Sequence, residues 1–324
     1  MTIRRVLILA PALLTLVLLQ SYFWVPTYEE QTKGNPKRLV NYISGSIGDA
    51  SLLNPILSAD SASSTIEGMV FEGLIDRDEE LRFRGRLAVS WEIYEEAFFY
   101  VNEPANIPGL GKINPKIVAD LIKEAKKNPG TAAPELRDSL SHIDEVSVIP
   151  PQTFQVIRQE KDPDTDGKKS DVKISINAPA RIKLVLNKVD KNLFKNLQII
   201  MGKDYFKSFH EENYLSSNPD IGKEKLAAHA AELLPPTEHN PILEFRLRPG
   251  VKFHDGHIFD ANDVKFTYES IINPKNLSPR IPDYEPVKAV EVIDPMTLKI
   301  VYKRLYSPAI GTWSMGIRVV CKRF

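Results

Sequence analysis

The stretch that decides the fold reads ILEFRLRPGVKFHDG at residues 242–256 and HIFDANDVKFTYESII at residues 257–272. Its opening residues alternate apolar and polar side chains, and this period of two predicts a half-buried strand. Pro249 and Gly250 predict a turn, because proline presets φ and glycine accepts a positive φ. Val251 and Phe253 are expected to start a second short strand, which Asp255 and Gly256 end. The stretch therefore predicts two strands joined by a tight turn.

A helix is expected to follow, with Asp260 as its N-cap. Asp263 would lie in the first helical turn, where the helix dipole favours negative charge. Apolar side chains then recur at helical spacing, at Val264, Tyr268, Ile271 and Ile272. Strand and helix signals in this order predict the α/β class.

This stretch resembles the core motif of family 5 of the bacterial extracellular solute-binding proteins, the peptide- and nickel-binding components of ABC importers. The matching positions are Leu247, Arg248, Gly250, Val251, Phe253, His254, Asp255, Gly256, Ala261, Asp263 and Val264. The resemblance implies a type II periplasmic-binding-protein fold, whose two lobes close around a ligand. It implies structural rather than catalytic roles for Arg248, Gly250, His254, Asp255, Gly256, Asp260 and Asp263.

Two segments nearer the N-terminus extend the resemblance: VFEGL at residues 70–74 and LAVSWE at residues 87–92. In the family the core strand follows the second segment directly, whereas here it is expected to begin at Ile242. The resemblance therefore divides the chain into a signal peptide or membrane anchor (1–26), a discontinuous solute-binding lobe I (37–96 and 242–317), an inserted accessory α+β domain (97–241) and an atypical tail (318–324).

Local patterns predict further elements. A helix is expected after Asp60, with an apolar face made of Ile66, Met69 and Val70. Gly73 is expected to end it with a left-handed φ. The remaining predictions are a β-hairpin over 287–302, helices over 115–127, 134–139 and 223–234, and strands around 146–148, 154–157, 172–176 and 182–186.

The loop DPDTDG at residues 162–167 invites a calcium interpretation. Asp162, Asp164 and Asp166 occupy the positions that supply oxygen ligands in a calcium loop. The closing position, however, is Lys173, where a bidentate Glu is needed, and the flanking residues predict strands rather than paired helices. A solvated hairpin tip is therefore favoured over a calcium site.

Other chemistry finds little support in the sequence. Lys and Arg together number 42, as do Asp and Glu, so no basic field argues for nucleic acid. Phosphate loops, nucleophile elbows and paired-His zinc motifs are missing, which argues against an enzyme. His254, Asp255 and His257 are too close in sequence to converge as tetrahedral ligands. Since Cys321 is the single cysteine, a cysteine-based metal site is not expected. We predict no metal and no cofactor.

The N-terminal residues predict export. Arg4 and Arg5 precede an apolar run over residues 6–25. Small residues that would mark a cleavage site are not well placed, and Tyr22, Phe23 and Trp24 resemble the aromatic belt of a spanning helix. An uncleaved anchor is therefore favoured over a cleaved signal, with the protein on the extracytoplasmic face of the inner membrane or in the periplasm.

The family implies a substrate-binding protein that captures a peptide or small solute and delivers it to ABC permease and ATPase subunits. The ligand is expected against the loop that contains Ser46, Ile47, Gly48 and Asp49. Because the family pattern ends after Ile317, we interpret the chain as truncated, with the first lobe only and weaker peptide binding than intact relatives have. The alternative is a membrane-anchored interaction module that does not transport.

Overall fold

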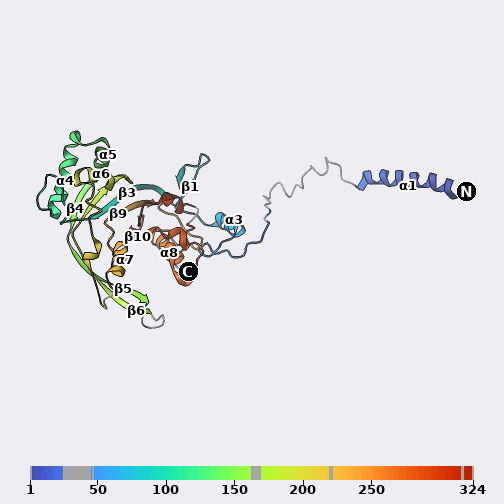
Figure 1. Ribbon diagram of the computed structural model, residues 1–324. Coiled ribbons are helices and arrows are strands. Elements are labelled where there is room, and N and C mark those ends of the chain that lie inside the picture. Colours follow the sequence, from blue (N-terminus) through green and yellow to red (C-terminus); the bar gives the residue numbers. More distant parts are fainter. Residues whose placement is uncertain are drawn as a thin grey trace. The chain divides into compact units, whose positions relative to one another are not determined.

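The computed structural model describes residues 2–24, 45, 47–161, 169–218, 222–314 and 317–322. The chain divides into two compact units, Met1–Asp49 and Ala50–Phe324. Helix α1 (Thr2–Trp24) belongs to the first unit, and the other described elements belong to the second (Figure 1). Each unit is described by itself.

The second unit mixes helices and strands, so the predicted α/β class is confirmed. Its helices are α3 (Ser61–Val70), α4 (Pro115–Lys127), α5 (Pro134–His142), α6 (Leu193–Met201), α7 (Lys223–Leu233), α8 (Ala261–Ile272) and α9 (Ala309–Thr312). Its strands are β1 (Ile75–Arg77), β2 (Phe83–Gly85), β3 (Ala88–Tyr100), β4 (Ile143–Ile149), β5 (Gln152–Lys161), β6 (Lys169–Ala178), β7 (Arg181–Leu186), β8 (Leu215–Asn218), β9 (Thr237–Leu247), β10 (Val287–Asp294) and β11 (Thr297–Tyr302).

One six-stranded antiparallel sheet organises the second unit, in the order β10-β11-β9-β3-β7-β4. Its two central strands, β3 and β9, pair from Ala88↔Leu247 to Phe99↔Thr237. Strand β9 therefore begins before Ile242, where the sequence analysis placed its start. Both strands run through the sequence positions proposed as the borders of the insertion, 96/97 and 241/242. We call β10, β11 and the paired segments 88–96 and 242–247 the lobe half of the sheet. We call β4, β7 and the paired segments 97–100 and 237–241 the inserted half. The two halves share one continuous sheet.

Each half of the sheet has its own apolar core. In the lobe half, α8 and the side chains of β9, β10 and β11 bury a cluster around Trp313. The Trp313 indole N–H donates to the Tyr302 hydroxyl at 2.8 Å, and the rings of Tyr268 and Tyr284 pack against the indole. This hydrogen bond satisfies a polar group that burial would otherwise leave unpaired.

The inserted half is covered by α4, α5 and α6, which gather beside β4 in Figure 1. Phe99 of β3 meets the rings of Phe194 and Phe206 edge-on. On α4 the side chains of Val118 and Ile122 are buried, as its helical periodicity predicts. A smaller cluster lies under α7 and the three-stranded sheet β5-β6-β8, where Tyr100 stacks on Phe209.

Local signals located most boundaries correctly. Asn114 caps α4 by accepting the Ile117 N–H at 2.9 Å, and Asp260 with Asp263 forms a capping box on α8. The hairpin of β10 and β11 is present. Gly250 adopts a φ of 75° in the turn that follows β9. The prediction of a second short strand between Val251 and Asp255 is wrong. That segment makes only an isolated bridge, Lys252↔Ile258, because a tight turn over residues 253–257 reverses the chain directly after it.

Helix α3 is capped by Asp60 as predicted, but its predicted apolar face is wrong. Ile66, Met69 and Val70 are 42%, 73% and 52% exposed, whereas Ser63 and Glu67 are buried. The inner face is polar because Glu67 pairs there with the guanidinium of Arg318 and accepts a hydrogen bond from Ser58. A buried charge needs such partners, so they decide which face turns inward.

Gly73 does not take the left-handed φ predicted for it. The glycine is required for another reason, because a Cβ there would lie 2.1 Å from the Ser314 carbonyl oxygen. The backbone of residues 73–75 approaches the end of α9, where Leu74 N–H donates to the Trp313 carbonyl at 3.1 Å. This close approach attaches β1 to the lobe core.

Candidate functional site

The family-motif residues lie in turns and at a helix start. Arg248 donates from Nε to the Arg86 carbonyl at 2.9 Å, which holds the end of β9 against the end of β2. Asp255 accepts the His257 N–H at 2.9 Å in a turn where Gly256 has a φ of 87°. These contacts order the turn, in which the side chains of His254 and Asp255 are exposed, and the structural role of the motif stays a prediction.

The predicted ligand loop is only partly described. Ser46 lies outside the described residues, while Ile47, Gly48 and Asp49 are exposed and belong to the first unit. Their role as ligand-binding residues stays a prediction. Asp162, Asp164 and Asp166 also lie outside the described residues. The strands on either side of them pair up to Lys161↔Lys169, as expected for a hairpin rather than paired helices.

A cavity of about 520 Å³ opens where the lobe half of the sheet meets the inserted half. We call it the sheet cleft. One wall comes from β3, β9 and the segment after β11, and the other comes from residues 189–192. Its lining consists of Ile93, Val189, Asp190, Lys191, Asn192, Pro241, Ile242, Leu243, Tyr302, Leu305, Tyr306, Ser307, Ala309 and Ile310.

The lobe wall of the sheet cleft is apolar, and ring stacking and a hydrogen bond fix its side chains. Tyr302 and Tyr306 stack with ring centroids 6.1 Å apart, and the Tyr302 hydroxyl donates to the Ala309 carbonyl at 2.8 Å. Burial raises the pKa of Tyr302 above its ordinary value, so the phenol stays neutral at every physiological pH. This wall therefore offers aromatic and aliphatic surface without a charge.

The opposite wall carries polar groups in a fixed arrangement. The Asp190 N–H donates to Glu95 Oε2 at 2.8 Å, and Glu95 also pairs with His239 Nδ1. The Asp190 carboxylate accepts hydrogen bonds from Ser139 and from the Asn192 N–H. Glu95 is fully buried, so this network anchors the polar edge to β3. An apolar cavity with a few oriented polar groups is the usual form of a small-ligand site.

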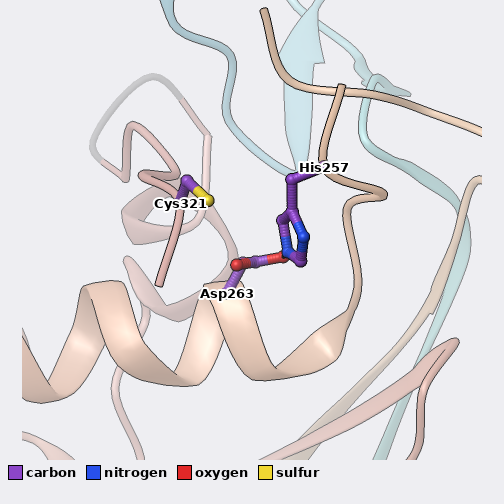
Figure 2. Close-up of side chains that lie close together, drawn as sticks. All are labelled: His257, Asp263 and Cys321. Carbon is purple, nitrogen blue, oxygen red and sulfur yellow. The ribbon is translucent and has the colours of Figure 1, made fainter. Parts of the chain in front are cut away.

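A second hollow of about 600 Å³ lies beside the family motif, and we call it the motif groove. It is lined by Leu53, Asn54, Pro55, Ile56, Phe71, Phe253, His254, Asp255, Phe266, Val320 and Cys321. Close to this groove, His257, Asp263 and Cys321 converge, as Figure 2 shows. This cluster is not evident in the sequence, because Cys321 is distant along the chain from the other two residues.

Residues 230–318 match the family described as bacterial extracellular solute-binding proteins, family 5, middle. We call residues 230–318 the family 5 segment, because the similarity to this family is confined to them. The family 5 segment contains β9, α8, β10, β11 and α9, and it supplies the lobe wall of the sheet cleft from Pro241 to Leu243 and from Tyr302 to Ile310.

A short part of the chain is also similar to known binding proteins. The chain is 44% identical over 65 residues to the glutathione-binding protein GsiB of Salmonella paratyphi A, and 39% identical over 66 residues to that of Pectobacterium atrosepticum. Each match covers 20% of this chain and 13% of the relative. The chain thus aligns with a small part of each relative's length, and these relatives are binding proteins rather than enzymes.

Two solved structures are similar to part of the chain. NikZ from Campylobacter jejuni in complex with Ni(L-His) is 34% identical over 26% of this chain and 16% of its own, with a TM-score of 0.24. The oligopeptide-binding protein AppA from Bacillus subtilis, in complex with a nonapeptide, is 16% identical over 86% of this chain and 27% of its own, with a TM-score of 0.37.

Proposed function

We propose that this protein is the solute-binding component of an ABC importer and that the sheet cleft contacts its ligand. The observation that carries the proposal is that the family 5 segment, residues 230–318, supplies one wall of the cleft. The other wall comes from the inserted half, so a ligand in the cleft would touch both halves of the sheet. Ligand sites favour such junctions, because two surfaces enclose more of a ligand than one surface can.

The chemistry of the cleft suits a small peptide or a peptide-like solute. The apolar wall of Ile93, Ile242 and Tyr306 can pack against aliphatic or aromatic side chains. Across the cleft, Asp190 and Asn192 provide oxygen and amide groups that can pair with peptide N–H and C=O groups. Such a ligand, once bound, would be handed to permease and ATPase subunits.

Export and anchoring form part of the same proposal. Among the described residues, one helix is long and apolar enough to cross a membrane, and its candidate span is Arg5–Phe23. An uncleaved α1 would hold the binding unit at the extracytoplasmic face of the inner membrane. Carbonate washing of membranes tests this point, and recovery of a protein that starts at Thr27 or later would identify a cleaved signal instead.

Binding of defined small peptides tests the function. We would titrate the full chain in detergent with reduced glutathione and with a pool of two- to five-residue peptides, by calorimetry and by mass spectrometry of retained peptides. Ile93→Arg places a charge on the apolar wall, where Ile93 is 44% exposed. We expect it to weaken binding by about tenfold or more, the cost of desolvating a charge against an apolar ligand.

The matched control is Ile293→Arg, because Ile293 is 57% exposed on β10 and does not line the cleft. Binding that both variants weaken equally, or that neither weakens, would place the ligand elsewhere. A failure of every probe to bind would favour the second candidate, a membrane-anchored interaction module. The exposed apolar side chains of α3, namely Ile66, Met69 and Val70, are the observation that favours that alternative.

A further inference from the structure

Three side chains of different segments meet beside the motif groove (Figure 2). One ligand atom from each of His257, Asp263 and Cys321 lies within 4.8 Å of the other two. His257 Nε2 is 3.4 Å from Asp263 Oδ2. Asp263 and Cys321 are 1% and 8% exposed, so water competes little for them. Nitrogen, oxygen and sulfur donors are thus gathered in one largely buried place.

The turn after β9 places the imidazole. The His257 carbonyl accepts the Phe253 N–H at 2.9 Å, which closes the turn. The rings of Phe253 and His257 stack with centroids 5.8 Å apart and planes inclined by 20°. The ring is therefore oriented before any ion arrives.

The capping box of α8 places the carboxylate. Asp263 Oδ2 accepts the Asp260 N–H at 3.0 Å, and Oδ1 accepts the Lys322 N–H at 3.0 Å. A carboxylate has about four lone-pair positions, so each oxygen keeps one after these two hydrogen bonds. Asp263 can therefore cap α8 and coordinate a metal ion at the same time.

Backbone hydrogen bonds on both sides of Cys321 place the thiol. The Val320 N–H donates to Thr267 Oγ1 at 3.0 Å, and the Lys322 N–H donates to Asp263. Both acceptors belong to α8. Upstream, the pairing of Arg318 with Glu67 attaches the same segment to α3. The cysteine is consequently pinned against the first two turns of α8.

We propose that His257, Asp263 and Cys321 bind a divalent transition metal ion, with Zn²⁺ as the best fit. Zinc accepts imidazole, carboxylate and thiolate ligands in tetrahedral sites. Metal–ligand bonds of about 2.0–2.1 Å place tetrahedral nitrogen and oxygen ligands about 3.3–3.4 Å apart, which is the separation observed between His257 and Asp263. Calcium and magnesium prefer all-oxygen sites and would not select a thiol and an imidazole.

Three protein ligands leave a fourth tetrahedral position free. Because Cys321 lines the motif groove, that position can be reached from the groove by water or by a small anionic ligand. The site revises the expectation that the single cysteine excludes a cysteine-containing metal centre. It uses one thiol with two ligands of other types.

Cobalt titration of the untagged full chain in detergent tests the proposal, with Co²⁺ as a coloured substitute for Zn²⁺. We expect one equivalent of Co²⁺ to bind and to produce a thiolate-to-cobalt charge-transfer band, which Zn²⁺ then removes. Cys321→Ser should abolish that band. His257→Gln should weaken binding by at least about tenfold, since even indirect supports of a metal site contribute that much.

The matched control is His254→Gln, because His254 is exposed on the same turn and lies outside the cluster. It should leave the band and the affinity unchanged. A cobalt complex without a thiolate band, or equal effects of His254→Gln and His257→Gln, would overturn the proposal. Circular dichroism of each variant shows whether a loss of binding reflects a loss of fold.

Alkylation of the Cys321 thiol gives a second test of metal binding that does not depend on a cobalt absorption band. Cys321 is the chain's one cysteine, so the iodoacetamide adduct measured by mass spectrometry reports on that thiol alone. Zn²⁺ should slow the alkylation of the wild-type chain and of His254→Gln at least about tenfold, and it should protect His257→Gln much less. Alkylation that Zn²⁺ leaves unchanged in the wild-type chain would contradict a Cys321–metal bond.

Discussion

Helix α4 of the inserted half and helix α3 of the lobe half turn different kinds of face inward. In the inserted half, α4 presents Val118 and Ile122 to the strands, as its apolar stripe predicts. In the lobe half, α3 presents Ser63 and Glu67 inward and leaves Met69 exposed. The comparison teaches that helical periodicity shows where the apolar face of a helix lies. Whether that face is buried depends on the residues that pack against the helix.

Because β3 and β9 run through both halves, we expect the two halves to unfold together. Truncating large side chains in the two cores should have the largest effect on stability and tests this expectation. Phe245→Ala in the lobe core and Phe99→Ala in the inserted core should each lower the free energy of unfolding by about 3–5 kcal/mol. Because both rings lie on the same strand pair, urea unfolding should show one transition by fluorescence and by circular dichroism. Two separate transitions would instead show that the halves unfold as independent domains.

The polar inner face of α3 can be tested through its ion pair. Arg318→Met should lower the free energy of unfolding by on the order of 3 kcal/mol, because it leaves the buried Glu67 without its cation. The double variant Glu67→Met with Arg318→Met should recover most of that loss, since neither charge remains buried. Urea denaturation of the single and double variants measures both effects, and additive losses would contradict direct pairing.

The cap of α3 should make the lobe half sensitive to acid. Hydrogen bonds from Ser51 and Ser63 hold the pKa of Asp60 well below its ordinary value of 3.8. A lowered pKa stabilises the folded chain fully above the ordinary value, and the stabilisation is lost as pH falls through the folded value.

The stability difference between the wild-type chain and Asp60→Asn should therefore be constant at neutral pH and shrink below about pH 4, near the ordinary carboxyl pKa. Urea unfolding at several pH values measures that difference. A difference that grows in acid would contradict this sign.

The smallest effect is expected on the exposed face of α3. Met69→Lys should change the free energy of unfolding by no more than about 0.5 kcal/mol, because the side chain is 73% exposed. Val118→Lys is the matched control in α4, where the same new charge would be buried and the loss should be several-fold larger. If Met69→Lys destabilises the chain as much as the control does, the face of α3 is covered after all.

The sequence by itself determined the features that depend on chain neighbours. The caps at Asn114 and Asp260, the turn at Gly250 and the hairpin of β10 and β11 all followed from residue types within a few positions of one another. Such signals are readable because capping and turn hydrogen bonds form between residues that are close along the chain. The motif around His254 likewise indicated the family, because its residues follow one another closely in the chain.

The tertiary structure decided what depends on distant partners. The start of β9 at Thr237 depends on pairing with β3, and the buried face of α3 depends on Arg318. The cluster that includes Cys321 exists because residues 317–322 pack against α8. Alternation and periodicity report only whether one side of an element differs from the other. Which side is buried depends on the segments, distant in the chain, that pack against it. A buried charge or a buried strand edge is stable only when its partner is present.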